Sequence, residues 1–200
     1  MIPVAPRVTP TINPTSVVII GASTGGTRVV PEILAKAGRL RACVLVVQHM
    51  PKFINQTFTR ALADCCAMPV RLAQDLDPLE EGIIYVAPSE SHCTVLRQRR
   101  LHVNSGAKVN FVCPSIDVTM LSLRKPAQGH RLVGVVLTGM GRDGAEGIVH
   151  MKELGAVTVA QDKRSCAVHG MPDEAACTGC VDYVLSPDDI ATLLRRLLGW

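Results

Sequence analysis

The sequence has few aromatic residues: Phe, Tyr and Trp together make up 3% of its 200 residues. Proteins that bind single-stranded nucleic acid stack bases on such rings along a basic groove, whereas the Lys and Arg residues here are scattered along the chain. The net charge of +4 therefore does not indicate a nucleic-acid-binding protein, and we expect no nucleic acid partner.

Long apolar runs are also missing. No stretch approaches the roughly 18 residues that span a bilayer, and the N-terminus lacks the charged region and apolar stretch of a secretory signal. We therefore expect no membrane insertion and a cytoplasmic location. In that reducing compartment the eight cysteines should not form a disulfide framework, and Cys43, Cys65 and Cys66 lie in aliphatic patterns where a thiol is a small apolar filler.

Aliphatic residues are abundant, since 48% of the chain is hydrophobic. That is enough to bury a substantial core as one compact domain. Residues 1–16 differ, because four prolines among Thr, Asn and Ser favour extended backbone that cannot supply a core. We expect a proline-rich linker or arm over residues 1–16 and a folded, monomeric domain over residues 17–200.

Short β-branched runs alternate with helical patterns through this domain. The runs at 17–20, 44–47, 83–86, 133–137, 157–159 and 183–185 predict strands, and the stretches near 27–37, 54–67, 116–124, 145–154 and 173–178 predict helices. Continuous aliphatic strands separated by helices indicate a parallel sheet buried on both faces. The fold class is therefore α/β: a doubly wound, mainly parallel sheet with helices on both faces.

Two further features can be placed on this framework. Residues 92–96 and 101–103 flank a polar, basic stretch and predict an appended antiparallel β-hairpin, whose basic tip (97–100) we expect to be solvated surface. Ser186, Pro187 and Asp189 have the spacing of a helix cap, a first helical residue and a capping box. They predict the start of a final amphipathic helix.

The first candidate site follows the first strand, at Gly21-Ala22-Ser23-Thr24-Gly25-Gly26. This Gly-x-Ser-x-Gly pattern in a strand-to-helix turn exposes the serine hydroxyl as a nucleophile, and the Thr24 N–H can point at a developing oxyanion. A phosphate-binding loop is the rival interpretation, but it requires Lys where Thr27 stands. A glycine-rich turn with an idle serine is the other alternative.

The second and third candidates also follow strands, and ligands of open parallel sheets bind at that edge. His49 could act as the base that takes the Ser23 proton. Asp143 could accept the imidazole N–H of His49 and fix its tautomer. The same loop contains Gly139-x-Gly141-x-x-Gly144, which alternatively suggests a dinucleotide-binding module with Asp162 on the ribose.

At these residues the chain resembles the catalytic domain of CheB-type protein-glutamate methylesterases of bacterial and archaeal chemotaxis. The resemblance runs from about Val17 to the final helix. It rests on separate motifs in the family's order: Gly21 to Gly26, Gln48-His49-Met50-Pro51, Ala87-Pro88 with His92, Pro114-Ser115-Ile116-Asp117, Leu137 to Gly141 with Asp143-Gly144, and Gly170-Met171-Pro172.

The resemblance implies an enzyme that hydrolyses glutamate methyl esters on chemotaxis receptors, releases methanol, and in many members deamidates receptor glutamines. It places the nucleophile, base and orienting carboxylate on Ser23, His49 and Asp143, in agreement with the assignments above. Thr24 N–H is the first oxyanion donor and the Met140 loop the second. The chemistry is acyl transfer and needs neither metal nor organic cofactor.

The chain departs from the family pattern at three positions. Cys113 replaces an arginine before Pro114, and Lys163 and His169 stand where an acidic residue and a phenylalanine are common. These changes affect the expected substrate contacts and leave open a weakened, receptor-binding scaffold as an alternative function. The family usually carries an N-terminal receiver domain over the active site, whereas here only the proline-rich arm precedes the catalytic motifs. Two alternatives therefore stay open: a fragment controlled by a receiver domain in cis or in trans, and a stand-alone enzyme that lacks this control.

Four further residues have the residue types of a zinc site. Cys166-x-x-His169 and Cys177-x-x-Cys180 supply four potential ligands of the kind that structural zinc sites use. The segment between the two pairs is short for familiar zinc patterns. We therefore assign no metal site, and leave metal binding by this group as the less favoured alternative.

Overall fold

The computed structural model describes residues 16–126 and 128–200. The predicted arm lies outside these residues except for Ser16, which is the first residue of strand β1. The large sheet has the order β3-β4-β2-β1-β7-β8-β9, and every pairing in it is parallel. Its strands are β1 (Ser16–Ala22), β2 (Cys43–Gln48), β3 (Val70–Leu72), β4 (Ile84–Val86), β7 (Arg131–Val136), β8 (Val157–Gln161) and β9 (Tyr183–Leu185).

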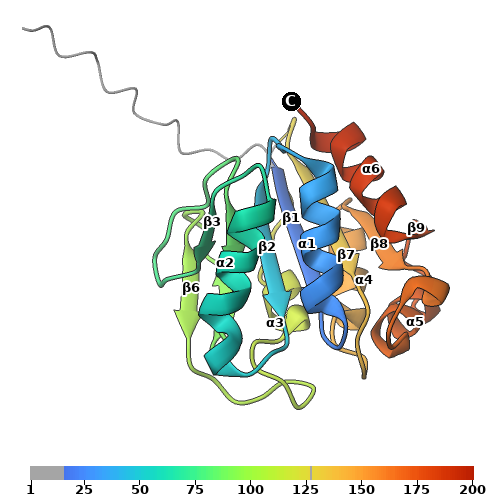
Figure 1. Ribbon diagram of the computed structural model, residues 1–200, viewed down its shortest axis with the longest axis horizontal. Helices are drawn as coiled ribbons and strands as arrows, with labels where there is room; N and C mark the ends of the chain where they lie inside the picture. Colours follow the sequence, from blue (N-terminus) through green and yellow to red (C-terminus); the bar gives the residue numbers. More distant parts are fainter. Residues whose placement is uncertain (1–15, 127) are drawn as a thin grey trace, which may run out of the picture.

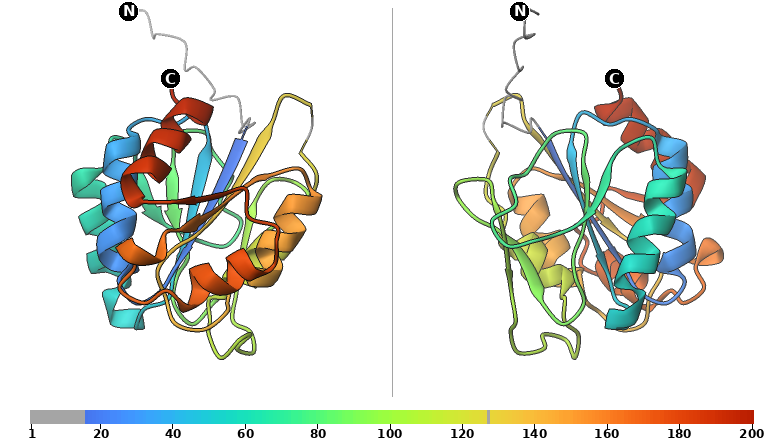
Figure 2. Two further views of the ribbon diagram at one scale, coloured as in Figure 1. Left: turned by 90° about the vertical axis from the view of Figure 1, so that its right-hand side faces the viewer. Right: turned by 60° about the vertical axis from the view of Figure 1, so that its left-hand side comes forward.

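Helices cover both faces of the sheet, so the molecule has three layers (Figures 1 and 2). One face carries α1 (Gly26–Ala37), α2 (Asn55–Cys65) and α6 (Pro187–Leu198). The other carries α3 (Ile116–Leu121), α4 (Ala145–Glu153), α5 (Gly170–Cys177) and the hairpin of β5 (His92–Val95) and β6 (Leu101–Asn104). Two short 3₁₀ helices, η1 (Lys52–Ile54) and η2 (Lys163–Ser165), lie in connecting loops. No helix among the described residues is long and apolar enough to cross a membrane.

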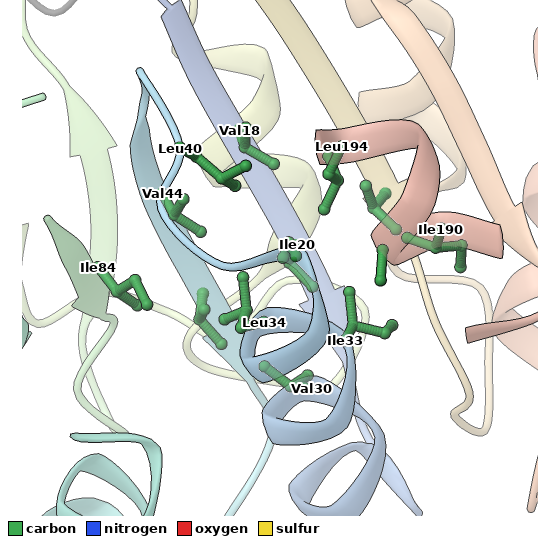
Figure 3. Packing of buried hydrophobic residues seen from close by; sticks show 14 of the residues in the cluster. Val18, Ile20, Val30, Ile33, Leu34, Leu40, Val44, Ile84, Ile190 and Leu194 are labelled. Atoms are coloured by element: carbon green, nitrogen blue, oxygen red, sulfur yellow. The ribbon is translucent and has the colours of Figure 1, made fainter. Parts of the chain in front are cut away.

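Alternate residues of each central strand pack into different cores. Val18 and Ile20 of β1 face α1 and α6, whereas Ile19 between them packs in the second core on the α3 side. Figure 3 shows the first of these cores, with Ile33 and Leu34 of α1 against the sheet. Because both faces are buried, the strands are aliphatic throughout, as the sequence predicted.

Strand order decides which loops meet. β1 is central, with β2 paired on one side and β7 on the other. Since these strands are parallel, the loops that follow them leave the same edge of the sheet. Those loops carry Ser23 after β1, His49 after β2 and Asp143 after β7.

The predicted fold class is confirmed, with differences in detail. The hairpin forms its own two-stranded sheet instead of extending the large one. β3 was not predicted, because three residues at the sheet's edge give too short a pattern to recognise. The fifth helix starts at Gly170 rather than near 173, since Pro172 is tolerated in a first turn. The cap at Ser186 is confirmed: its side chain accepts the Asp189 N–H.

Candidate active site

Ser23 lies in a turn that its two neighbouring strands hold in place. Its N–H donates to Thr138 O over 2.9 Å, and its carbonyl accepts the Gly26 N–H and the Gln48 side-chain amide. Gly25, with φ of 87°, supplies the left-handed conformation that lets the chain reverse into α1. The predicted strand-to-helix turn is therefore present, with the Ser23 side chain partly exposed.

His49 and Asp143 are in direct contact, although 94 residues separate them in sequence. His49 Nε2 lies 2.9 Å from Asp143 Oδ2. The backbone N–H of His49 donates to Ala22 O, which ties the histidine to the residue before Ser23. The other ring nitrogen, Nδ1, has no hydrogen-bond partner among the described residues. With the hydrogen on Nε2 directed at the carboxylate, Nδ1 is the nitrogen available as a base.

The Asp143 carboxylate is almost completely buried, with 2% of its surface exposed. Its Oδ2 accepts the Ile116 N–H (2.6 Å), and its Oδ1 accepts the Ser115 hydroxyl (2.7 Å), the Asp117 N–H (3.2 Å) and the Asn110 amide (3.3 Å). Burial raises the pKa of Asp143, but the hydrogen bonds from His49, Ile116 and Ser115 outweigh it and hold the pKa below its ordinary value. Asp143 is therefore an anion when His49 becomes protonated.

Asp117 is a second buried carboxylate beside Asp143. The Asn110 amide bridges the two, donating to Asp117 Oδ2 over 2.8 Å. Asp117 Oδ1 accepts the N–H groups of Gly144 (2.9 Å) and Gly147 (2.7 Å) at the start of α4. Burial, and secondarily the charge of Asp143, raise the pKa of Asp117 to about 6 despite these bonds. Through its bonds to Gly144 and Gly147, Asp117 orients the segment that carries Asp143.

The raised pKa of Asp117 makes a prediction about stability. A pKa that folding raises from 3.8 to about 6 adds stability that is complete below the lower value and is lost as pH rises through the higher one. Lowering the pH from 8 to 5 should therefore raise the contribution of Asp117 to the free energy of unfolding by about 1 kcal/mol. Asp117→Asn, which keeps an acceptor oxygen for Gly144 and Gly147, should remove that difference.

Urea unfolding of both proteins at the two pH values measures it. Asp64→Asn, which changes an exposed carboxylate on α2, should leave the wild-type pH dependence in place. A pH dependence that is identical in wild type and Asp117→Asn would contradict the burial argument.

Gln48 connects the turns of Ser23 and His49. Its Nε2 donates to the carbonyls of both residues, over 2.8 and 2.9 Å, and its side chain is buried against Gly26. Gln48 belongs to one of the family motifs, but no role was predicted for it. Asn110, Ser115 and Asp117 were missed as site residues in the same way, although the last two belong to a quoted motif.

Two backbone N–H groups beside Ser23 are free to bind an anion. Neither the Thr24 nor the Met140 N–H has a hydrogen-bond partner among the described residues. The Thr24 N–H shares its peptide group with Ser23 O, and the bonds that Ser23 O accepts from the Gly26 N–H and the Gln48 side-chain amide fix its orientation. Thr138 Oγ1 donates to Thr24 O (2.8 Å) and accepts the Val168 N–H (3.0 Å), which holds the following peptide group. The structure therefore leaves both predicted oxyanion donors unoccupied on adjacent loops.

Gly139 packs directly against Ser23. A Cβ added at Gly139 would lie 2.7 Å from Ser23 Cβ and 2.3 Å from Met171 Sδ. Met171 is completely buried in the second core, and Ser23 is held by its backbone hydrogen bonds. Gly139→Ala should therefore displace Ser23 and lower its rate of reaction with a fluorophosphonate by about 10²-fold.

Gly134→Ala provides the matched control within β7. A Cβ there would meet only the flexible ends of Ile148 and Met151, both at 3.3 Å, so we expect labelling close to the wild-type rate. Wild-type labelling by Gly139→Ala would contradict the packing argument.

The Gly139 loop is not arranged for a dinucleotide. The N-terminus of α4, where the pyrophosphate would bind, is already occupied by the Asp117 carboxylate. The loop instead packs closely against the start of α5. A Cβ added at Gly170 would lie only 3.2 Å from Gly141 N. Asp162, the candidate ribose ligand, bonds with Arg164 in η2.

The cysteine and histidine residues near the C-terminus do not gather. Among the described residues, no three His, Cys, Asp or Glu side chains are placed to hold a metal ion, and His169 contacts Asp173 at 2.6 Å. Cys113 is half-buried before a cis proline, and burial raises the pKa of its thiol. Among the described residues, neither His169 nor Lys163 hydrogen-bonds to His49 or Asp143.

Known proteins are similar to this chain in sequence and in architecture. Residues 18–194 match the family model described as CheB methylesterase. Proteins named protein-glutamate methylesterase/protein-glutamine glutaminase from Syntrophus aciditrophicus and Bordetella parapertussis are 38% and 40% identical, each over 91% of this chain. The chain spans about half the length of these relatives: 54% and 53%. The solved Thermotoga maritima CheB methylesterase catalytic domain superposes with a TM-score of 0.81 at 32% identity, covering 90% of this chain and 97% of that one.

Proposed function

Because the chain belongs to the CheB methylesterase family, we propose that it hydrolyses the methyl esters of glutamate side chains on chemotaxis receptors and deamidates receptor glutamines. The observation that carries the proposal is the buried His49–Asp143 pair on the loop edge that also holds the Ser23 turn. The relatives' names supply the substrate class.

In the proposed mechanism Ser23 Oγ attacks the ester carbonyl while His49 Nδ1 takes its proton. The new C–O bond makes an oxyanion that accepts hydrogen bonds from the Thr24 and Met140 N–H groups. His49 then returns the proton to the departing methoxide, and methanol leaves an acyl-enzyme. Water, deprotonated by His49, releases the glutamate and restores Ser23; with glutamine as substrate, ammonia leaves in place of methanol.

Each residue has a separate contribution to the rate. A positioned base supplies about 10²–10⁴-fold, and a single oxyanion donor about 10²–10³-fold. Asp143, already ionised, stabilises the imidazolium that forms during attack. Metal or organic cofactors have no role in this proposal, which places the reaction in the cytoplasm and the catalytic unit as a monomer, with control by a receiver domain in cis or in trans.

The exposed apolar residues around the site favour a protein substrate. Phe53 is 80% exposed, Phe111 94% and Met140 74%, and they lie on the loops that carry His49, Asn110 and the oxyanion donor. Exposed large apolar groups grouped around a site indicate a macromolecular contact. A small ester would not need them.

The double variant Phe53→Ser/Phe111→Ser tests this contact. Because only a receptor reaches these rings, kcat/KM for methylated receptor should fall about tenfold or more relative to kcat/KM for p-nitrophenyl acetate. Leu76→Ser/Tyr183→Ser, which also removes two exposed apolar side chains, is the control. An unchanged ratio in the first double variant would contradict a role in receptor binding.

Mass spectrometry of a methylated receptor tests the proposed function itself. Incubation with the protein should remove one CH₂ from each esterified glutamate, with an equal amount of methanol, and convert glutamine side chains to glutamate. Loss of mass without methanol, or no change in the receptor, would contradict it.

A further inference from the structure

A cavity of about 310 Å³ lies at the edge of the sheet opposite Ser23. It is bordered by the first residues of β1 and β7, by the turn of the β5–β6 hairpin, and by the segment that follows α3. A strand of seven residues spans about 20 Å, so β1 separates this cavity from the active site. The proposed hydrolysis does not use it.

Positive charge is concentrated around the cavity. Five Lys and Arg side chains border it, and no Asp or Glu does: Arg97, Arg99, Arg124, Lys125 and Arg131. Among the described residues, no ion pair with a carboxylate is formed by Arg97, Arg124, Lys125 or Arg131. Grouped cations that lack protein carboxylates favour a bound anion. The hairpin tip, expected to be solvated surface, thus contributes Arg97 and Arg99 to a concave basic site.

His130 adds a neutral donor to this group. Arg99 Nη2 lies 2.9 Å from His130 Nδ1, and a guanidinium can only donate. His130 Nδ1 therefore accepts, and the ring hydrogen is on Nε2. The Arg99–His130 contact therefore fixes the orientation of N–H donors beside the other Lys and Arg side chains of the cavity.

The inner wall of the cavity is apolar. Leu79, Leu123 and Leu132 are nearly completely buried and pack beneath it. The apolar side chains that border the cavity and are partly exposed are Val17, Val95 and Leu96. Such a surface binds a flat apolar body, whereas the arginine rim matches the geometry of phosphate oxygens. The volume is near the lower end of the range for small-molecule sites, about 300–1,000 Å³.

We propose that this cavity is a nucleotide-binding site, with the base against the apolar wall and a diphosphate held by Arg97, Arg124 and their basic neighbours. A concave site with an apolar wall fits a small molecule better than a membrane surface or an extended nucleic acid. This proposal does not depend on the proposed hydrolysis.

Calorimetric titration of the whole chain with ADP tests the ligand class. We expect saturable binding in the micromolar range, and binding of adenosine and of pyrophosphate at least about tenfold weaker, because each makes only half of the contacts. Absence of heat with ADP, pyrophosphate binding as tight as that of ADP, or a preference for vesicles of anionic phospholipid would each overturn the proposal.

A pair of double variants tests the location. Arg97→Gln/Arg124→Gln should weaken ADP binding at least about tenfold, since charge-assisted hydrogen bonds are lost. Arg60→Gln/Arg196→Gln removes two exposed arginines from α2 and α6 and should bind ADP like the wild type. Equal weakening in both would indicate general electrostatic attraction and overturn the assigned site.

Photo-crosslinking of the unaltered protein with 8-azido-ADP locates the site without relying on a variant. Modified peptides should contain residues 95–99, 122–126 or 130–132, while Ser23 keeps its reactivity toward a fluorophosphonate. Crosslinks confined to residues 139–144 would assign nucleotide binding to the glycine loop beside the active site and contradict this proposal.

Discussion

Ser23→Ala is expected to lower methanol release from methylated receptor by about 10⁴–10⁶-fold, since removing a triad nucleophile leaves only binding and oxyanion stabilisation. The fold should be unaffected, because the hydrogen bonds that hold this turn use the backbone of Ser23 and not its hydroxyl. Methanol release followed by a coupled alcohol oxidase assay measures the loss. Ser105→Ala, at an exposed loop position, should retain the wild-type rate.

The same variant separates an enzyme from a receptor-binding scaffold. A fluorophosphonate should label the wild type at Ser23 and leave Ser23→Ala unlabelled, because labelling requires an activated hydroxyl. Equal methanol release by Ser23→Ala and wild type would show that another group performs the attack. A wild-type protein that binds receptor but is never labelled would instead be a scaffold.

Asp143→Asn is expected to lower kcat by about 10⁴-fold with the fold retained, as the same change does in a serine protease triad. Three donors converge on Oδ1 and two on Oδ2, namely His49 and the Ile116 N–H. The asparagine oxygen should therefore occupy the Oδ1 position, and its NH₂ should face His49 while the Ile116 N–H loses its acceptor. His49 Nε2 must then accept a hydrogen bond. The ring hydrogen moves to Nδ1, and the nitrogen that should take the Ser23 proton is blocked.

Asp182→Asn is the matched control for Asp143→Asn. Hydrogen bonds also hold the pKa of Asp182 below its ordinary value against the effect of burial, but Asp182 contacts Thr158 and Lys152 at the opposite edge of the sheet. It should keep near wild-type kcat. A loss of less than about tenfold in Asp143→Asn would contradict the tautomer argument.

The sequence predicted the loops of the site because strand ends can be read locally. Gly21 to Gly26 follows an aliphatic run, and so do His49 and the Gly139 loop. The parallel order of β2, β1 and β7 then brings them together. The family resemblance and the positions of the strand ends both indicated Ser23, His49 and Asp143, and the structure places His49 and Asp143 in hydrogen-bond contact.

The support around Asp143 could not be read in this way. Asn110, Ser115 and Asp117 reach it because the N-terminus of α3 lies beneath the loop after β7. That contact depends on how α3 and α4 pack, which no local pattern specifies. The basic cavity was missed for the same reason, since residues from four separate segments border it.

Ser23, His49 and Asp143 should act as one hydrogen-bonded unit, and a crystal structure of the fluorophosphonate adduct would show whether they do. We expect phosphorus on Ser23 Oγ, a phosphoryl oxygen accepting the Thr24 N–H, and His49 Nδ1 within hydrogen-bond distance of the adduct while Nε2 remains on Asp143. An adduct on another residue, or a His49 ring directed away from Ser23, would contradict the account.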